Sequence, residues 1–239
     1  MAKRDVAMSR LNELLGAGVI AKAQMAVRHT DGGNVSGSLM EDASKKGKSG
    51  FNMAKDGDFY DPSTGGTKDK TDQVSLEDPE LMRQLSRLQL IDLLALQVDR
   101  NRKNYYIQTD GAGKVIGLVG IDNDFSMGTS VNVEGRNQEL PGISRYVDEE
   151  LANAILKLDI EMLKALMQDL LSESEIAALV SRVKKLQEFL KPLKDQGKLI
   201  KPNEWDSAMA KNLLAEKIPG KSIPKNYYSM LVEEAKRKK

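Results

Sequence analysis

The amino-acid sequence predicts an α+β fold, and three observations carry this prediction. Two β-type runs, at 104–108 and 114–121, are joined by a glycine-bearing turn and predict an antiparallel hairpin. Apolar residues at helical spacing predict a long helix before this hairpin and four or five helices after it. The chain of 239 residues is long enough for one large domain or two lobes with a sizeable core.

The composition excludes several classes of protein. Lys and Arg number 36 and Asp and Glu 35, so the net charge of +1 gives no electrostatic reason to expect a nucleic-acid partner. The chain has no cysteine, which excludes disulfide and thiolate chemistry, and its single histidine, His29, excludes a histidine-rich metal site. No apolar run reaches the roughly 18–20 residues of a membrane span, and the N-terminus lacks the apolar core of a secretory signal. We therefore expect a soluble, cytoplasmic protein without a transmembrane segment.

The N-terminal region contains a predicted helix, a predicted strand and a polar stretch. Residues 4–17 carry apolar side chains at helical spacing, and Gly16 and Gly18 are stop signals. The segment 19–29 reads as a strand and is followed by turn residues. Residues 41–77 are rich in Gly, Lys, Asp, Ser and Thr, so we expect a long, mobile loop there. Its lysine-rich part is either a solvated loop or a loop that wraps an anion.

The central and C-terminal regions are predicted to be mostly helical. Residues 78–98, "DPELMRQLSRLQLIDLLALQV", form an amphipathic pattern whose second half is apolar nearly all round, so that half should be buried. Further along, Ser172 and Glu175 have the spacing of a capping box before another helix. These patterns divide the chain into an N-terminal region, 1–77, and a mostly helical region, 78–239.

Polar residues that prefer hard cations stand at both ends of the predicted hairpin. Asp99 follows the buried helix, Asn104 begins the first strand and Asp122 follows the second. Antiparallel pairing brings the two ends of a hairpin together, so these three residues should converge. Two carboxylates and an amide oxygen form the ligand set that Mg²⁺ prefers, usually beside substrate phosphates. Asp124 is either a further metal ligand or a turn residue.

The sequence of this segment resembles that of a known family. Asp-x₄-Asn, a hairpin and then Ile-Asp are similar to the catalytic core of the protein-kinase-like fold. "VDRNRKN" and "IDND" resemble the atypical branch: phosphatidylinositol kinases, secretory-pathway kinases related to the Golgi casein kinase, and HipA-like bacterial kinases. The resemblance implies that Asp99 positions or deprotonates the acceptor hydroxyl and that Arg100 orients Asp99 or its loop. It also implies that Asn104 and Asp122, with Asp124 as a further ligand, hold Mg²⁺ or Mn²⁺ on the phosphates of ATP.

The resemblance covers about residues 4–40 and 80–160 and implies a two-lobed architecture. Residues 1–77 would be a partial small lobe with a flexible polar insertion at about 41–77, and 78–239 a helical large lobe. Asp92 matches an acidic helix position of some relatives, and Asp5 stands where the family has a Glu that pairs with the ATP-binding Lys. Only four residues precede Asp5, so we expect either a chain that lacks most of the small lobe or a protein that binds nucleotide differently; Lys22 is a poor substitute for the missing lysine.

Two functions remain open at this point. The first is an ATP- and Mg²⁺-dependent phosphotransferase of atypical kinase type that acts on a protein or lipid hydroxyl, and the metal triad favours it. The second is a non-catalytic, kinase-like (pseudokinase) module that binds a protein partner, and the missing lysine and glycine-rich loop favour it. By analogy, a chain of this kind is also expected among bacterial effectors that enter a host cell by a route without a signal peptide.

Overall fold

The computed structural model describes residues 2–43, 47–49, 59–60, 74–134 and 139–237, and within them the predicted α+β class is confirmed. The helices are α1 (Ala2–Leu14), α3 (Pro79–Ala95), α4 (Glu149–Leu156), α5 (Ile160–Met167), α6 (Glu173–Asp195), α7 (Ala208–Leu214) and α8 (Tyr227–Arg237), with a 3₁₀ turn η3 (Arg102–Asn104). The strands are β1 (Ala23–Thr30), β2 (Gly33–Met40), β3 (Gly47–Ser49), β4 (Phe59–Tyr60), β5 (Val74–Ser75), β6 (Tyr105–Thr109) and β7 (Val115–Gly120).

The predicted central hairpin is present as β6 and β7. The two strands pair antiparallel, with Tyr105 opposite Gly120. Their turn is closed by Asp110, whose Oδ1 accepts hydrogen bonds from two backbone N–H groups of the turn at 2.9 Å. A third strand, β3, pairs antiparallel with β6. This corrects part of the expected loop at 41–77, because three of its residues extend the sheet; most of that stretch lies outside the described residues.

The N-terminal helix ends earlier than expected. Helix α1 ends at Leu14 rather than at residue 17, because Gly16 and Gly18 have φ angles of 59° and 69°, in the left-handed region that glycine adopts without strain. Asn12 then fixes the direction of the chain, since its Oδ1 accepts hydrogen bonds from the N–H groups of Val19 and Ile20. The segment after α1 therefore runs beside β7 and forms an isolated parallel bridge with it.

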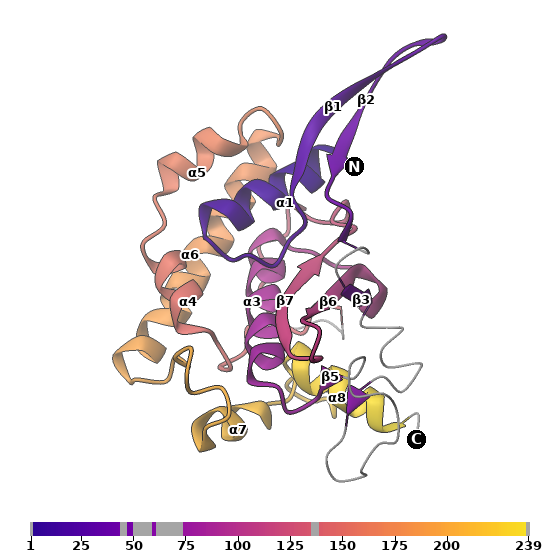
Figure 1. The fold of residues 1–239 in the computed structure, drawn as a ribbon. Coiled ribbons are helices and arrows are strands. Elements are labelled where there is room, and N and C mark those ends of the chain that lie inside the picture. The colour runs from indigo at the N-terminus through magenta and orange to yellow at the C-terminus, as the bar shows by residue number, and fades with distance from the viewer. Residues whose placement is uncertain (1, 44–46, 50–58, 61–73, 135–138, 238–239) are drawn as a thin grey trace.

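The predicted strand after α1 is confirmed as β1, and its partner β2 completes a hairpin. The two strands pair along their full length and form a two-stranded sheet of their own. The hairpin extends away from the rest of the molecule (Figure 1). Its strands carry exposed apolar side chains: Met25, Val27, Val35 and Leu39.

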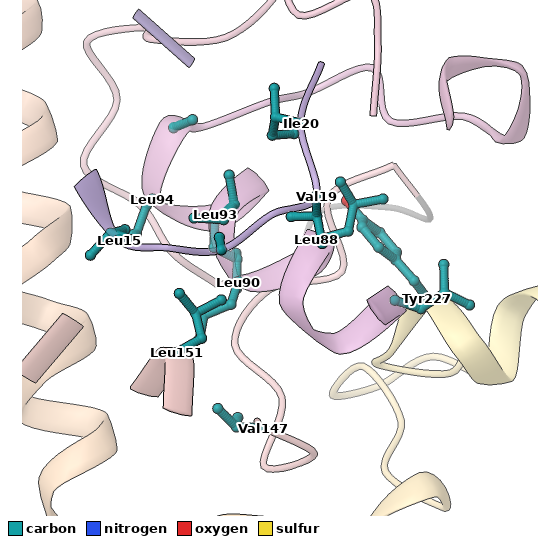
Figure 2. Packing of buried hydrophobic residues seen from close by; sticks show 14 of the residues in the cluster. Leu15, Val19, Ile20, Leu88, Leu90, Leu93, Leu94, Val147, Leu151 and Tyr227 are labelled. Atoms are coloured by element: carbon teal, nitrogen blue, oxygen red, sulfur yellow. The ribbon is translucent and has the colours of Figure 1, made fainter. Parts of the chain in front are cut away.

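Helix α3 is the centre of the core. It begins at the N-cap Asp78, whose side chain accepts a hydrogen bond from the backbone of Glu80, and its last turn closes on Leu96 in the left-handed conformation. Apolar residues of the N-terminal segment, α3, α4 and α8 meet around it, among them Leu15, Leu93 and Leu151 (Figure 2). The largest apolar cluster thus includes residues from both regions of the chain.

Within the described residues, five helices follow the hairpin, as expected. Helices α4, α5 and α6 lie on the side of α3 away from the β6–β7 hairpin, whereas α8 lies below the hairpin (Figure 1). The capping box at the start of α6 is confirmed, since Ser172 and Glu175 exchange side-chain-to-backbone hydrogen bonds. Trp205 is buried and packs edge-on against Tyr146, with ring centroids 4.9 Å apart. Among the described residues, no helix has both the length and the apolar character that crossing a bilayer requires.

Candidate functional site

The structure brings the three residues at the ends of the hairpin together. Asn104 Nδ2 donates a hydrogen bond of 2.8 Å to the Asp99 carbonyl and lies 3.4 Å from Asp99 Oδ2. The Ile121 N–H, at the end of β7, donates to the Asn104 carbonyl at 2.9 Å. Asp122 follows directly, and the charge of Asp99 is among the causes that raise its pKa. The hairpin therefore converts a separation along the chain into a cluster of oxygen atoms.

The Arg100 side chain fixes this cluster from the interior of the protein. Its side chain is buried, and its Nε and Nη2 donate to the two carboxylate oxygens of Asp92 at 2.9 and 3.0 Å. Nη1 donates to the carbonyls of Asn104 and Ile121, and Nη2 also donates to Asn123 Oδ1, each at 2.6 Å. All five N–H donors of the guanidinium are thus used within the protein. Arg100 orients the loop, and its charged group faces inward.

The partner of Arg100, Asp92, is completely buried on α3. Burial raises the pKa of Asp92, while the Arg100 guanidinium and the Tyr227 hydroxyl, which donates to Asp92 Oδ2 at 3.0 Å, oppose that rise. Burial would lower the pKa of Arg100, but the Asp92 carboxylate more than offsets this, so the pKa of Arg100 is raised. Asp92 on α3 therefore anchors the loop through its ion pair with Arg100.

The loop after β7 turns one carboxylate outward and one amide inward. Asp122 has a φ of 55°, a left-handed conformation that Asp tolerates better than most residues, and its side chain is exposed. Its carbonyl accepts a hydrogen bond from Gln97 Nε2 at 2.9 Å. The next residue, Asn123, is completely buried. Partial desolvation by the surrounding protein, the charge of Asp124, a hydrogen bond with Asp124 and the charge of Asp99 all raise the pKa of Asp122, although the residue is exposed. Two carboxylates thus crowd one another at this corner.

Asp5 is a further member of the site that sequence reasoning assigned to another role. The resemblance placed it as the partner of a lysine, but its Oδ1 accepts a hydrogen bond from the Asn123 N–H at 3.0 Å. Burial raises its pKa; the Asn123 N–H opposes this, and the negative charges of Asp124 and Asp122 add to it. The feature of the sequence that could have pointed to this role is an acidic residue on the otherwise apolar face of α1. Lys22 is exposed at the base of the β1–β2 hairpin.

The side-chain oxygens of this site suit a hard cation that another molecule helps to coordinate. Asp124 Oδ1 is buried without a hydrogen-bond partner among the described residues, and Asp122 is exposed beside it. Among all the residues that the structure describes, no group of three or more His, Cys, Asp or Glu side chains is arranged to hold a metal ion by itself. A cation here would therefore need ligands beyond these carboxylates, such as Asn104 Oδ1 and phosphate oxygens.

Comparison with known proteins adds no assignment to this geometry. No protein-family model matches the sequence, and no curated protein matches it.

Proposed function

We propose that the natural protein is an ATP- and Mg²⁺-dependent phosphotransferase with an atypical kinase-like fold, acting on a protein or lipid hydroxyl. The observation that carries this proposal is the convergence of Asp99, Asn104 and Asp122 at the ends of one hairpin, held from inside by Arg100. This grouping would supply a base, an amide oxygen and a metal-binding carboxylate, which are among the protein groups that phosphoryl transfer uses beside the nucleotide.

In this proposal Asp99 positions the acceptor hydroxyl or takes its proton. The Asp99 N–H donates to Gln97 Oε1 at 3.1 Å, and Asn101 Nδ2 lies 3.3 Å from Asp99 Oδ1. The first contact fixes the backbone at Asp99 and the second helps to orient its carboxylate. Such groups typically contribute about 10²–10⁴-fold to the rate.

The divalent cation would be held by Asn104, Asp122 and Asp124. Asn104 Nδ2 donates a hydrogen bond to the Asp99 carbonyl, so the amide oxygen, Oδ1, is the atom of this side chain that would bind the cation. When bound, Mg²⁺ or Mn²⁺ would neutralise charge on the phosphates of ATP. Asp5 keeps the loop in position through the Asn123 N–H.

Two isosteric substitutions test the proposal. Asp122→Asn should weaken Mg²⁺-dependent nucleotide binding as well as turnover, because this carboxylate holds the metal. Asp99→Asn should leave nucleotide binding nearly intact while turnover falls by at least about 10²-fold. Asp206→Asn, on an exposed residue, is the matched control. Nucleotide affinity, phosphate transfer and a melting curve are measured on each variant; a folded Asp99→Asn variant with full activity would contradict the assignment.

A second candidate is a non-catalytic module that binds a protein partner, and the β1–β2 hairpin favours it. Met25, Val27, Val35 and Leu39 are between 39% and 59% exposed on a two-stranded sheet whose outer edges pair with no other described strand. If the parent shows no transfer and both variants bind nucleotide as the parent does, this second function replaces the first.

A further inference from the structure

Strand β2 has a free outer edge in the part of the chain that the structure describes. It pairs with β1 along its full length, and no other described strand pairs with it. The hairpin extends away from the rest of the molecule, so this edge faces outward (Figure 1). A two-stranded hairpin alone is only marginally stable in water and normally gains stability from a further strand or a packed helix. The edge of β2 is therefore a place where another strand can be added.

The backbone groups on this edge belong to alternate residues. The Glu41 N–H donates to the Lys22 carbonyl at 2.9 Å, and this pair continues the register of the β1–β2 ladder. Hydrogen-bonded and non-hydrogen-bonded pairs alternate along an antiparallel ladder. Counting back from Glu41, Gly37 bonds to β1, whereas Ser36 and Ser38 turn their N–H and C=O groups outward. The outer edge thus presents donors and acceptors at every second residue.

The sequence of β2 is nearly symmetric about Gly37. A serine stands on each side of this glycine, and an apolar residue, Val35 or Leu39, stands two positions away on each side. Val35 and Leu39 share one face of the strand and are 58% and 59% exposed. The strand contains no charged residue and no proline, which are the usual devices that stop an edge strand from pairing. The edge therefore complements a copy of itself that runs antiparallel.

Gly37 has no structural reason within a single chain. Its φ angle lies outside the left-handed region that favours glycine, and a β-carbon there would meet no atom of the described residues within 4 Å. Glycine weakens a strand interior and often marks a point where another backbone comes close. In an antiparallel pair centred on Gly37, this residue lies opposite its own copy as a non-hydrogen-bonded pair, where the Cα atoms are only about 4.5 Å apart.

The edge of β1 is less suited to such pairing. The Ala23 N–H points to that edge and donates to Ser9 Oγ on α1 at 3.0 Å, so the start of the edge is occupied. Strand β1 also carries Arg28 and His29. The symmetric, uncharged edge of the hairpin is that of β2.

We propose that two copies of this chain dimerise by antiparallel pairing of their β2 strands, with a two-fold axis between Gly37 and its copy. Ser36 of each copy exchanges backbone hydrogen bonds with Ser38 of the second copy, and Val35 lies opposite Leu39 of the second copy. The two hairpins then form one four-stranded sheet through an isologous contact. One strand edge is a small interface, so the dimer fraction rises with protein concentration. The proposal does not depend on phosphotransfer, and its partner is a second copy rather than a different protein.

Cysteine substitution tests the two-fold axis directly, because the chain has no cysteine of its own. Gly37→Cys places two thiols opposite each other, at a Cα separation near the lower end of the range of about 4.4–6.8 Å that disulfides span. Mild oxidation of the full chain should convert most of this variant to a covalent dimer. Asn34→Cys, on the same strand, should stay uncoupled, because six strand positions of about 3.4 Å place it about 20 Å from its copy. The proposal is overturned if Gly37→Cys forms no dimer or if both variants cross-link equally.

A pair of charge variants tests the register without a covalent bond. In sedimentation equilibrium, Val35→Glu and Leu39→Lys should each weaken dimerisation by about tenfold, because the two-fold axis repeats each change. An equimolar mixture should dimerise better than either variant alone, since the register sets position 35 of one variant opposite position 39 of the other. Val27→Lys, on β1 and 55% exposed, is the matched control and should dimerise as the parent does.

Three outcomes of this measurement overturn the proposal. The first is a parent that stays monomeric at millimolar concentration. The second is a mixture that dimerises no better than the single variants, because the register is then wrong. The third is a Val27→Lys variant that dimerises as weakly as Val35→Glu, because the contact then does not follow the β2 edge.

Discussion

Replacing Arg100 with Met should reveal how much of the site depends on one buried guanidinium. Methionine fills a similar volume but provides no donors, so the substitution removes five hydrogen bonds at once. Asp92 is then left completely buried with only the Tyr227 hydroxyl as a partner. The carbonyls of Asn104 and Ile121 lose a charged donor as well, so both ends of the hairpin are affected.

The expected loss of stability is large. Removing one member of a buried ion pair costs about 3–5 kcal/mol, because the other charge remains without compensation. A domain of this kind has a free energy of unfolding of about 5–15 kcal/mol, so this loss is a large fraction of the total. Adding Asp92→Asn to Arg100→Met removes the uncompensated charge and should recover about 2 kcal/mol, within the usual range for residues in contact.

The assay is urea unfolding of the parent, both single variants and the double variant, with Arg10→Met, at a partly exposed surface ion pair, as the control. The pH dependence gives a further test. Loss of Arg100 raises the pKa of Asp92 in the folded state further above its unfolded value. The stability of Arg100→Met should therefore fall more steeply than that of the parent as pH rises from 5 to 8, and Asp92→Asn should remove this difference. A loss below about 1 kcal/mol for Arg100→Met, or strict additivity in the double variant, would refute the reasoning.

Three further predictions concern other parts of the structure. Arg182→Met should lower the free energy of unfolding by about 2 kcal/mol or more in a thermal melt, because the buried Arg182, whose pKa burial lowers to about 10, donates to the Leu94 carbonyl at 2.7 Å and to two loop carbonyls. Asp5→Asn keeps an acceptor for the Asn123 N–H but removes a carboxylate whose pKa is raised in the folded state. Such a carboxylate makes the protein less stable as pH rises through its folded-state pKa. Between pH 4 and 8 the melting temperature of the variant should therefore fall less than that of the parent. Calorimetric titration should show tighter Mg²⁺ binding with ATP than without it, and Asp122→Asn should abolish the difference; equal affinities in the parent would argue against a site shared with phosphate.

Much of the local structure could be predicted from short-range patterns. Pro79 after Asp78, the apolar run of α3 and the glycine-bearing turn of the β6–β7 hairpin depend on neighbours in the sequence, so their elements were found. The early end of α1 was missed by a few residues, since the apolar pattern continues past the point where Gly16 stops the helix. Strand β3 was missed because a short polar segment becomes a strand only when an edge such as β6 is there to pair with it.

The candidate site divides in the same way. The convergence of Asp99, Asn104 and Asp122 follows from hairpin geometry alone, so residue order was sufficient to predict it. The roles of Asp92 and Asp5 were not accessible from residue order, because each depends on a helix packing against the hairpin from a distant part of the chain.

The sequence specifies which residues can be helical, which can pair as strands and where the chain must turn, because propensity, periodicity and turn chemistry act over a few residues. Packing chooses which polar groups face one another. Arg100 is an ordinary charged residue until α3 presents Asp92 to it and the two hairpin ends present their carbonyls. The cavity of about 400 Å³ between the loop after Asp99 and α8 likewise exists only because the C-terminal helix returns to this loop. Contacts between residues so far apart in the sequence depend on the chain entropy lost in closing the loop between them and on the apolar area buried across the whole fold. No local pattern encodes these two quantities.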